Sequence, residues 1–241
     1  MKAIVAALVL VLTACSGDDD GAGAADASTP AVPDAAVPFG MISGDCMVLD
    51  SELTEAQPSL FTSAFAFERI FEDGDSDRVS SGTNTLLGTE NAGGSSIYSE
   101  AFVFELLNRC EGAQLLATEN QIDYMPDGDK TDFSTSIDGL TIGVSVARAV
   151  RFPFDTPYSV DDATTLLEDK LSGILESSAN VVPDQAWEKQ ILGVMAYGPG
   201  HASSLQTALP AIDSAIRADT IVWIIVTDGD DGFIYCDGPC S

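Results

Sequence analysis

The sequence predicts a single α/β domain, built on a mixed sheet with helices on both faces. Two apolar runs, residues 140–150 and 220–226, contain almost no polar side chains, which is typical of strands buried on both faces. Ser159, followed by acidic residues at 161 and 162, marks the start of a long helix. With 45% hydrophobic residues, the chain can bury a core large enough for such a domain.

The first half of the domain is expected to combine one helix with three strands. Residues 60–71 suit a strand and a helix about equally. Ser95 or Ser96 caps a helix that ends at Gly112. Strands are expected over residues 114–124, 132–137 and 140–150, and Asp138-Gly139 forms the hairpin turn between the last two.

The second half is expected to hold two or three helices and a final strand. The helices are expected over residues 159–175, 184–195 and 202–216. The apolar strand 220–226 follows them and leads into a turn rich in Asp and Gly. The order of one helix, three strands, two or three helices and one strand is typical of a mixed α/β architecture.

The N-terminal residues indicate export. Lys2 precedes an apolar run of about ten residues, too short for the roughly 20 that span a bilayer. The run ends in Leu12-Thr13-Ala14-Cys15, which resembles the lipobox of a bacterial lipoprotein signal. The resemblance implies that residues 1–14 are removed and that Cys15 carries the lipid. It also implies a lipid-anchored protein of the cell envelope, and Ser16 favours the outer membrane.

A tether is expected between the anchor and the folded domain. Residues 16–40 are rich in Ala, Gly, Pro and Asp and cannot bury enough apolar surface to fold. We therefore expect three parts: a signal peptide over residues 1–14, a lipidated tether over 15–40 and one globular domain over 41–241.

The charge of the chain limits its partners. Thirty-eight acidic residues against 10 basic ones give a formal net charge of −28. This field repels phosphate backbones and anionic lipid head groups, since binding to either relies on Lys and Arg. The sequence therefore disfavours nucleic acid as a partner. It predicts contact with the membrane through the lipid anchor, and an unknown protein or ligand as the partner of the domain.

Four cysteines remain besides Cys15, and an exported chain can pair them as two disulfides in three ways. The tight turn Cys236-Asp-Gly-Pro-Cys240 can close on itself, which leaves Cys46 to pair with Cys110. A zinc site is disfavoured because Cys-x3-Cys is not the usual ligand spacing and the chain holds a single His.

Three residues suggest a further resemblance. Glu100 lies in the first helix, Asp132 starts the second of the three strands, and Gln190 lies on a later predicted helix. With the order α-β-β-β-α-β, this arrangement resembles the restriction-endonuclease-like core of the PD-(D/E)XK superfamily. Residues 119–149 also resemble a little-characterised family of such domains. The resemblance implies a restriction-endonuclease-like fold, with catalytic residues that hold a divalent metal for phosphodiester hydrolysis.

The third strand departs from the superfamily pattern. It should supply Asp/Glu-x-Lys, but it reads Gly143-Val-Ser145-Val-Ala-Arg148. The metal would lack its second carboxylate and the nucleophile would lack its positioning amine. We therefore expect a domain that binds or has a structural role, without a cofactor. The alternative is a metal-dependent phosphodiesterase with a non-standard site drawn from Glu100, Asp132, Ser145, Arg148 and Gln190.

The sequence offers weaker support for two other kinds of site, a calcium-binding loop and a serine hydrolase site. Asp73, Asp75 and Asp77 imitate the start of a calcium loop and are candidates for weak divalent-cation binding, although Arg78 and Asn84 break the EF-hand template. A serine hydrolase would need Ser145 and the only histidine, His201. The segment Gly143-Val-Ser145-Val-Ala departs from Gly-x-Ser-x-Gly, so this reading is disfavoured.

Overall fold

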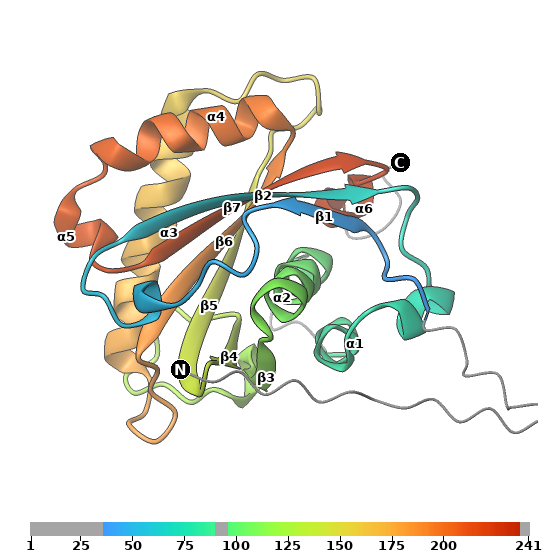
Figure 1. Ribbon diagram of the computed structural model, residues 1–241. Coiled ribbons are helices and arrows are strands. Elements are labelled where there is room, and N and C mark those ends of the chain that lie inside the picture. Colours follow the sequence, from blue (N-terminus) through green and yellow to red (C-terminus); the bar gives the residue numbers. More distant parts are fainter. Residues whose placement is uncertain (1–35, 90–95, 237–241) are drawn as a thin grey trace, which may run out of the picture. The chain divides into compact units, whose positions relative to one another are not determined.

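The computed structural model describes residues 36–89 and 96–236. The chain divides into a unit of residues 1–35 and a unit of residues 36–241, and all described residues lie in the second. No helix in the described part of the chain is both long and apolar enough to cross a membrane. The predicted class is confirmed: the domain is α/β, with one mixed sheet and helices on both of its faces (Figure 1).

Seven strands form the sheet in the order β1-β2-β7-β6-β5-β4-β3. The four central strands β2, β7, β6 and β5 are parallel, and β1, β4 and β3 each pair antiparallel with a neighbour. The strands are β1 (Met41–Gly44), β2 (Ser59–Phe67), β3 (Gln114–Thr118), β4 (Phe133–Ile137), β5 (Leu140–Ala149), β6 (Lys189–Tyr197) and β7 (Ile221–Gly229).

The helices divide between the two faces. One face carries α1 (Ser81–Leu87), α2 (Ile97–Glu111) and α6 (Gly232–Cys236), while the other carries α3 (Val160–Asn180), α4 (Pro199–Ala208) and α5 (Ser214–Arg217) (Figure 1). Short 3-10 turns complete the chain at Ser51–Leu53, Asp73–Arg78, Glu119–Gln121 and Leu209–Ala211.

The core on the α2 side is aromatic. The ring of Phe102, on α2, lies 5.2–5.9 Å from five other phenylalanine rings, and its side chain is fully buried. These rings come from segments far apart in the sequence and belong to Phe39, Phe65, Phe67, Phe71 and Phe233. Since each buried aromatic side chain removes a large apolar area from water, this cluster fixes α2 on the sheet.

The core on the opposite face is aliphatic. Leu167, Leu171 and Ile174 of α3 are buried against Leu192 and Val194 of β6. Their spacing along α3 is that of one face of an amphipathic helix. The strand β5 contributes to both cores: Val144 and Val146 belong to the aromatic one, Ala147 and Ala149 to the aliphatic one.

Several local predictions are confirmed. Ser159 and Asp162 form a reciprocal capping box at the start of α3, and Gly112 ends α2 in the left-handed conformation with φ 66°. Asp138 and Gly139 both have positive φ, as the hairpin turn between β4 and β5 requires. The strands predicted over 140–150 and 220–226 are β5 and β7, and both lie inside the sheet.

The helix predicted from Asp184 is wrong, because the segment folds as strand β6. Trp187, Ile191, Val194 and Met195 fit a helical stripe, but eight of the nine residues of β6 are buried. A strand covered on both faces has no apolar periodicity that distinguishes it from a helix. Gln190 therefore lies on a strand, not on a helix.

Other boundaries also differ. The strand predicted over 114–124 ends at Thr118, where Gln121 completes a capping box, and Tyr124 forms only an isolated bridge with Val181. The ambiguous segment 60–71 is strand β2 over most of its length. The helix predicted over 202–216 is divided into α4 and α5, with Asp213 capping the second piece.

The packed domain includes a residue that the sequence analysis assigns to the tether. Phe39 is 2% exposed and its backbone N–H donates to Arg78 O. Its ring packs edge-on against Phe71 at 5.1 Å. Ordered packing therefore begins before Met41.

The predicted disulfide between Cys46 and Cys110 is present, with Cα atoms 4.8 Å apart. It joins the segment after β1 to the last turn of α2. The other predicted pairing, Cys236 with Cys240, and the predicted lipid attachment at Cys15 each involve a residue, Cys240 or Cys15, that lies outside the described residues.

We predict that Gly193→Ala destabilises the domain by about 1–3 kcal/mol, the usual effect of forcing extra atoms into a packed core. A Cβ at Gly193 would lie 2.6 Å from Val103 Cγ1 of α2. Gly200→Ala, in α4, is the matched control, since a Cβ there meets nothing within 4 Å. Urea denaturation of the two variants checks the difference, and equal midpoints would contradict the account.

Candidate acidic site

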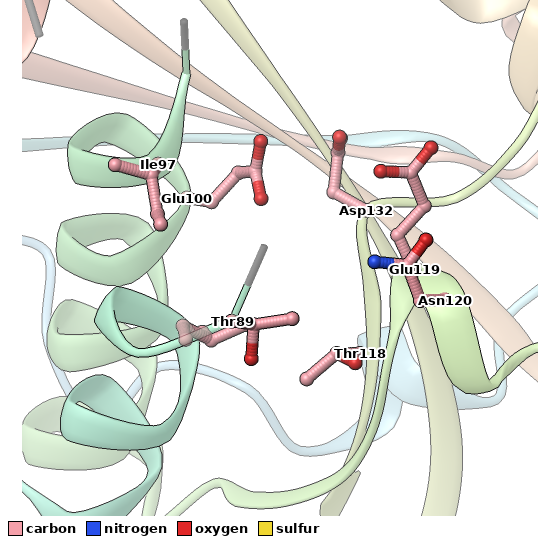
Figure 2. Close-up of a pocket in the computed structure, with 8 residues that line it drawn as sticks. Thr89, Ile97, Glu100, Thr118, Glu119, Asn120 and Asp132 are labelled. Atoms are coloured by element: carbon pink, nitrogen blue, oxygen red, sulfur yellow. The ribbon is translucent and has the colours of Figure 1, made fainter. Parts of the chain in front are cut away.

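A small cleft lies between the first turn of α2 and the start of β4. Glu100 comes from α2 and is 6% exposed, and its Oε1 accepts a hydrogen bond from Ser96 Oγ. A carboxylate in the first turn of a helix is favoured by the helix dipole. Figure 2 shows Glu100 pointing from the helix toward Asp132 across the cleft.

Asp132 is held by the neighbouring strand. Its backbone N–H donates to Val144 O at 3.1 Å, and its Oδ2 accepts from Val146 N at 2.6 Å. The side-chain carboxylate of Asp132 therefore accepts the hydrogen bond from Val146 N that the β4 backbone does not accept at this point. The side chain is fixed at the entrance of the β4–β5 hairpin.

Glu119 is the third carboxylate that lines the cleft, with Thr118 and Asn120 beside it (Figure 2). These residues follow the end of β3, and Thr118 pairs with Phe133 at the start of β4. The cavity measures about 10 Å³. This is about the volume that one water molecule needs, so the cleft does not admit an organic substrate in this conformation.

Burial, followed by the negative charge of Glu100, raises the pKa of Asp132 to about 7. The hydrogen bond from Val146 and the positive charge of Lys170 act in the opposite direction. Two carboxylates in one poorly hydrated site resist ionising together, so a proton is retained at higher pH than an isolated Asp would hold it.

Strand β5, next to Asp132, supplies neither of the groups that the superfamily pattern requires. None of its ten residues is Asp, Glu or Lys, and its only charged side chain is Arg148. Val144 and Val146 are buried in the aromatic core. Arg148 Nη1 donates to the carbonyl oxygens of Ile234 (3.4 Å) and Tyr235 (3.2 Å), so it contacts the C-terminal helix α6.

Two of the candidate catalytic residues lie elsewhere. Ser145 alternates with Val144 and Val146 along β5 and faces the α3 side of the sheet. Gln190 lies on that side too. When the side-chain amide is oriented so that both its nitrogen and its oxygen form hydrogen bonds, Gln190 donates to Gly143 O at 3.0 Å and accepts from Trp187 Nε1 at 2.9 Å. The structure brings Glu100 and Asp132 together, but not Ser145 or Gln190 with them.

The other candidates have structural partners. Asp75 is 2% exposed and accepts hydrogen bonds from Arg69 at 2.7 Å and from Arg78 at 3.1 Å, whereas Asp73 and Asp77 are exposed. Within residues 36–89 and 96–236, no three acidic, His or Cys side chains are grouped to hold a metal ion. His201 stacks on the ring of Tyr158 at 4.9 Å and forms no hydrogen bond with Ser145 among the described contacts.

The sequence analysis missed Glu119 as a member of the site. The sequence offered no local signal for it, because β3 ends at Thr118, directly before Glu119, and not at residue 124 as predicted. The register between Thr118 and Phe133 brings the end of β3 and the start of β4 together. Without that register, the predicted strand 114–124 placed Glu119 inside a strand.

We predict that Asp132→Asn stabilises the domain at pH 8 by roughly 1–3 kcal/mol, or several degrees in Tm. The amide oxygen can still accept from Val146 N. The native pKa of Asp132 is raised above the unfolded value, so the wild-type loses stability as pH rises from about 4 to about 7. The difference should therefore vanish near pH 4.

The control for this pH dependence is Asp123→Asn, an exposed carboxyl outside the cleft. Thermal unfolding followed by circular dichroism at pH 4, 6 and 8 gives the comparison. A constant difference between Asp132→Asn and the wild type over this range would show that the carboxyl titrates normally.

Comparisons with known proteins place the chain near one relative. No protein-family model matches the chain, and no solved structure matches it. It is similar to the AAC-rich mRNA clone AAC4 protein of Dictyostelium discoideum, with 38% identity over 152 residues. The match covers 61% of this chain and 22% of that protein, so the chain spans about a fifth of its relative's length. The name of the relative states no activity, ligand or partner.

Proposed function

We propose that the protein is a lipid-anchored protein of the bacterial cell envelope whose α/β domain binds a partner or ligand and does not catalyse a reaction. The motif Leu12-Thr13-Ala14-Cys15 supports the anchor, and the segment rich in Ala, Gly and Pro that follows it supports a tether. The net charge of −28 supports a partner other than nucleic acid. Ser16 supports delivery to the outer membrane.

The topology supports the proposal of a restriction-endonuclease-like core. The elements α2, β3, β4, β5, α3 and β6 follow one another in the order α-β-β-β-α-β that the resemblance implies. The four strands are also neighbours in the sheet, in the order β3-β4-β5-β6. The positions of Glu100 in α2 and of Asp132 directly before β4 also support this proposal.

The observation that carries the non-catalytic assignment is the composition of β5. Phosphodiester hydrolysis with a bound metal needs carboxylates that share the cation and a group that positions the nucleophile. Glu100 and Asp132 face a strand that offers neither a carboxylate nor an amine. The raised pKa of Asp132 also leaves one of the two ligands partly protonated near pH 7, which weakens any cation site.

One observation favours the alternative, a metal-dependent phosphodiesterase. Glu119 lines the cleft with Glu100 and Asp132, and a carboxylate that arrives from the end of β3 is a substitute for the acid that β5 lacks. A bound cation would favour the charged form of Asp132 and so oppose the rise in its pKa. In this alternative, Glu119 is the displaced ligand.

A cleavage assay separates the two. We expect the purified full chain to leave plasmid DNA and a labelled RNA oligonucleotide intact with Mg²⁺ or Mn²⁺. The physical reasons are the missing ligands on β5 and the repulsion between phosphates and an acidic surface. Metal-dependent cleavage that is lost in Asp132→Asn and Glu119→Gln would establish the enzyme instead. Ser145→Ala, on the opposite face of the sheet, is the control that should leave such cleavage unchanged.

The lipid anchor has its own test. We expect Cys15→Ala to move the protein from the membrane fraction to the soluble fraction and to abolish incorporation of labelled palmitate, because the thiol is the only attachment point that the motif offers. Ser16→Ala is the neighbouring control and should remain labelled. Label that persists in Cys15→Ala would refute the lipobox assignment.

A further inference from the structure

A second groove lies beside the edge strand β1. It has a volume of about 430 Å³, within the range of roughly 300–1,000 Å³ that is usual for small-molecule sites. Residues 37–42 form one wall, and the end of β2 forms the other. The groove is separate from the acidic cleft, since no residue lines both.

Three guanidinium groups meet in this groove, although the chain holds only 10 basic residues against 38 acidic ones. Arg69 and Arg78 lie over the ring of Phe39, at 5.5 and 5.4 Å from its centroid. Arg109, near the end of α2, lies 5.6 Å from the ring centroid of Phe65. The aromatic faces hold the cations in place while leaving their in-plane N–H groups to other acceptors.

The three arginines differ in how their charges are balanced. Arg69 and Arg78 share the buried carboxylate of Asp75, and Glu72 also lies 3.9 Å from Arg69. Arg109 forms no ion pair among the described residues, and its Nη1 donates to the carbonyl oxygens of Phe39 and Gly40, each at 3.1 Å. Burial lowers the pKa of Arg109, and the negative charge of Glu105 acts in the opposite direction. A carboxylate in direct contact with Arg109 would offset the cost of burying its charge.

Apart from Glu68, which is exposed directly after β2, the remaining walls of the groove are apolar. Val37 and Met41 are 74% and 68% exposed, which is unusual for large hydrophobic side chains that have no role on the surface. Pro38, Ile42 and Ala66 continue the same surface. One end of the groove therefore suits an anion and the rest suits a hydrocarbon body.

We propose that this groove binds a small amphipathic carboxylate, with its head group on Arg109 and its apolar body against Met41 and Ile42. A single carboxylate matches one guanidinium in charge and in its planar, two-point geometry. A dianionic phosphate would enter the field of an acidic chain with one more negative charge and without a second unpaired cation to meet it.

Isothermal titration of the full chain tests the assignment with three probes. Octanoate carries both the head group and the apolar body, 1-octanol carries the body alone, and acetate carries the head group alone. We expect octanoate to bind with one-to-one stoichiometry and at least about ten-fold more tightly than either of the others, as expected when a charged hydrogen bond and apolar burial act together. No saturable octanoate binding, or equal binding of octanoate and octanol, overturns the proposal.

Two variants locate the site. Arg109→Gln should weaken octanoate binding by about ten-fold or more, since the charged donor is lost. Because Arg109 also holds the segment around Phe39, the second variant is Met41→Glu, which changes an exposed side chain and places a negative charge in the groove. The control is Arg151→Gln, an arginine 49% exposed and paired with Asp162. Octanoate binding that is unchanged in both groove variants would show that the ligand sits elsewhere.

Discussion

The close packing of α2 on the sheet is the constraint on which the other features depend. Gly193 leaves room for Val103, and Phe102 inserts among five rings that come from three separate parts of the chain, around residues 39, 65–71 and 233. A helix fixed along its length in this way has a fixed first turn. That turn carries Glu100, and its position over the start of β4 brings two carboxylates to one cleft.

This placement gives the carboxyl of Asp132 two roles that respond differently to protons. As an acceptor for Val146 N, it completes the hydrogen bonding of the hairpin, and a protonated carboxyl retains one oxygen that can do the same. The negative charge of the ionised carboxylate, by contrast, is disfavoured by burial and by the charge of Glu100. Protonation therefore removes the electrostatic conflict and preserves the structural bond, which explains how an acid can occupy this position in a well-packed domain.

Sequence patterns predicted the parts of this fold that depend on neighbouring residues. The cap at Ser159 and the turn at Asp138 and Gly139 are local chemistry, and both are present. Strand β6 was mistaken for a helix because both of its faces are covered, so its apolar residues carry no period. Glu100 and Asp132 were found through the resemblance to the restriction-endonuclease-like pattern, which places acids on the first helix and at the start of the second strand. Glu119 required the register of β3 on β4, which tertiary pairing decides.

Local sequence patterns could not predict the groove beside β1, for a similar reason. Arg109 lies about forty residues after Arg69 and about thirty after Arg78 in the sequence, and only the packing of α2 next to β1 and β2 brings it to them. In the sequence, each of the three arginines can be read as an ordinary surface residue. Only the fold shows that these positive charges, which come from distant segments, line one groove.

The disulfide has a mechanical consequence for a domain held from its N-terminal side. A pull applied there first reaches Phe39, then the short edge strand β1, which can be peeled from β2 one hydrogen bond at a time. Peeling stops at Cys46, because its covalent bond to Cys110 transfers the load directly to α2. The part of the chain that can extend ahead of the disulfide is thereby limited to the segment that ends at Cys46, and the load then falls on the last turn of α2, at the end opposite Glu100.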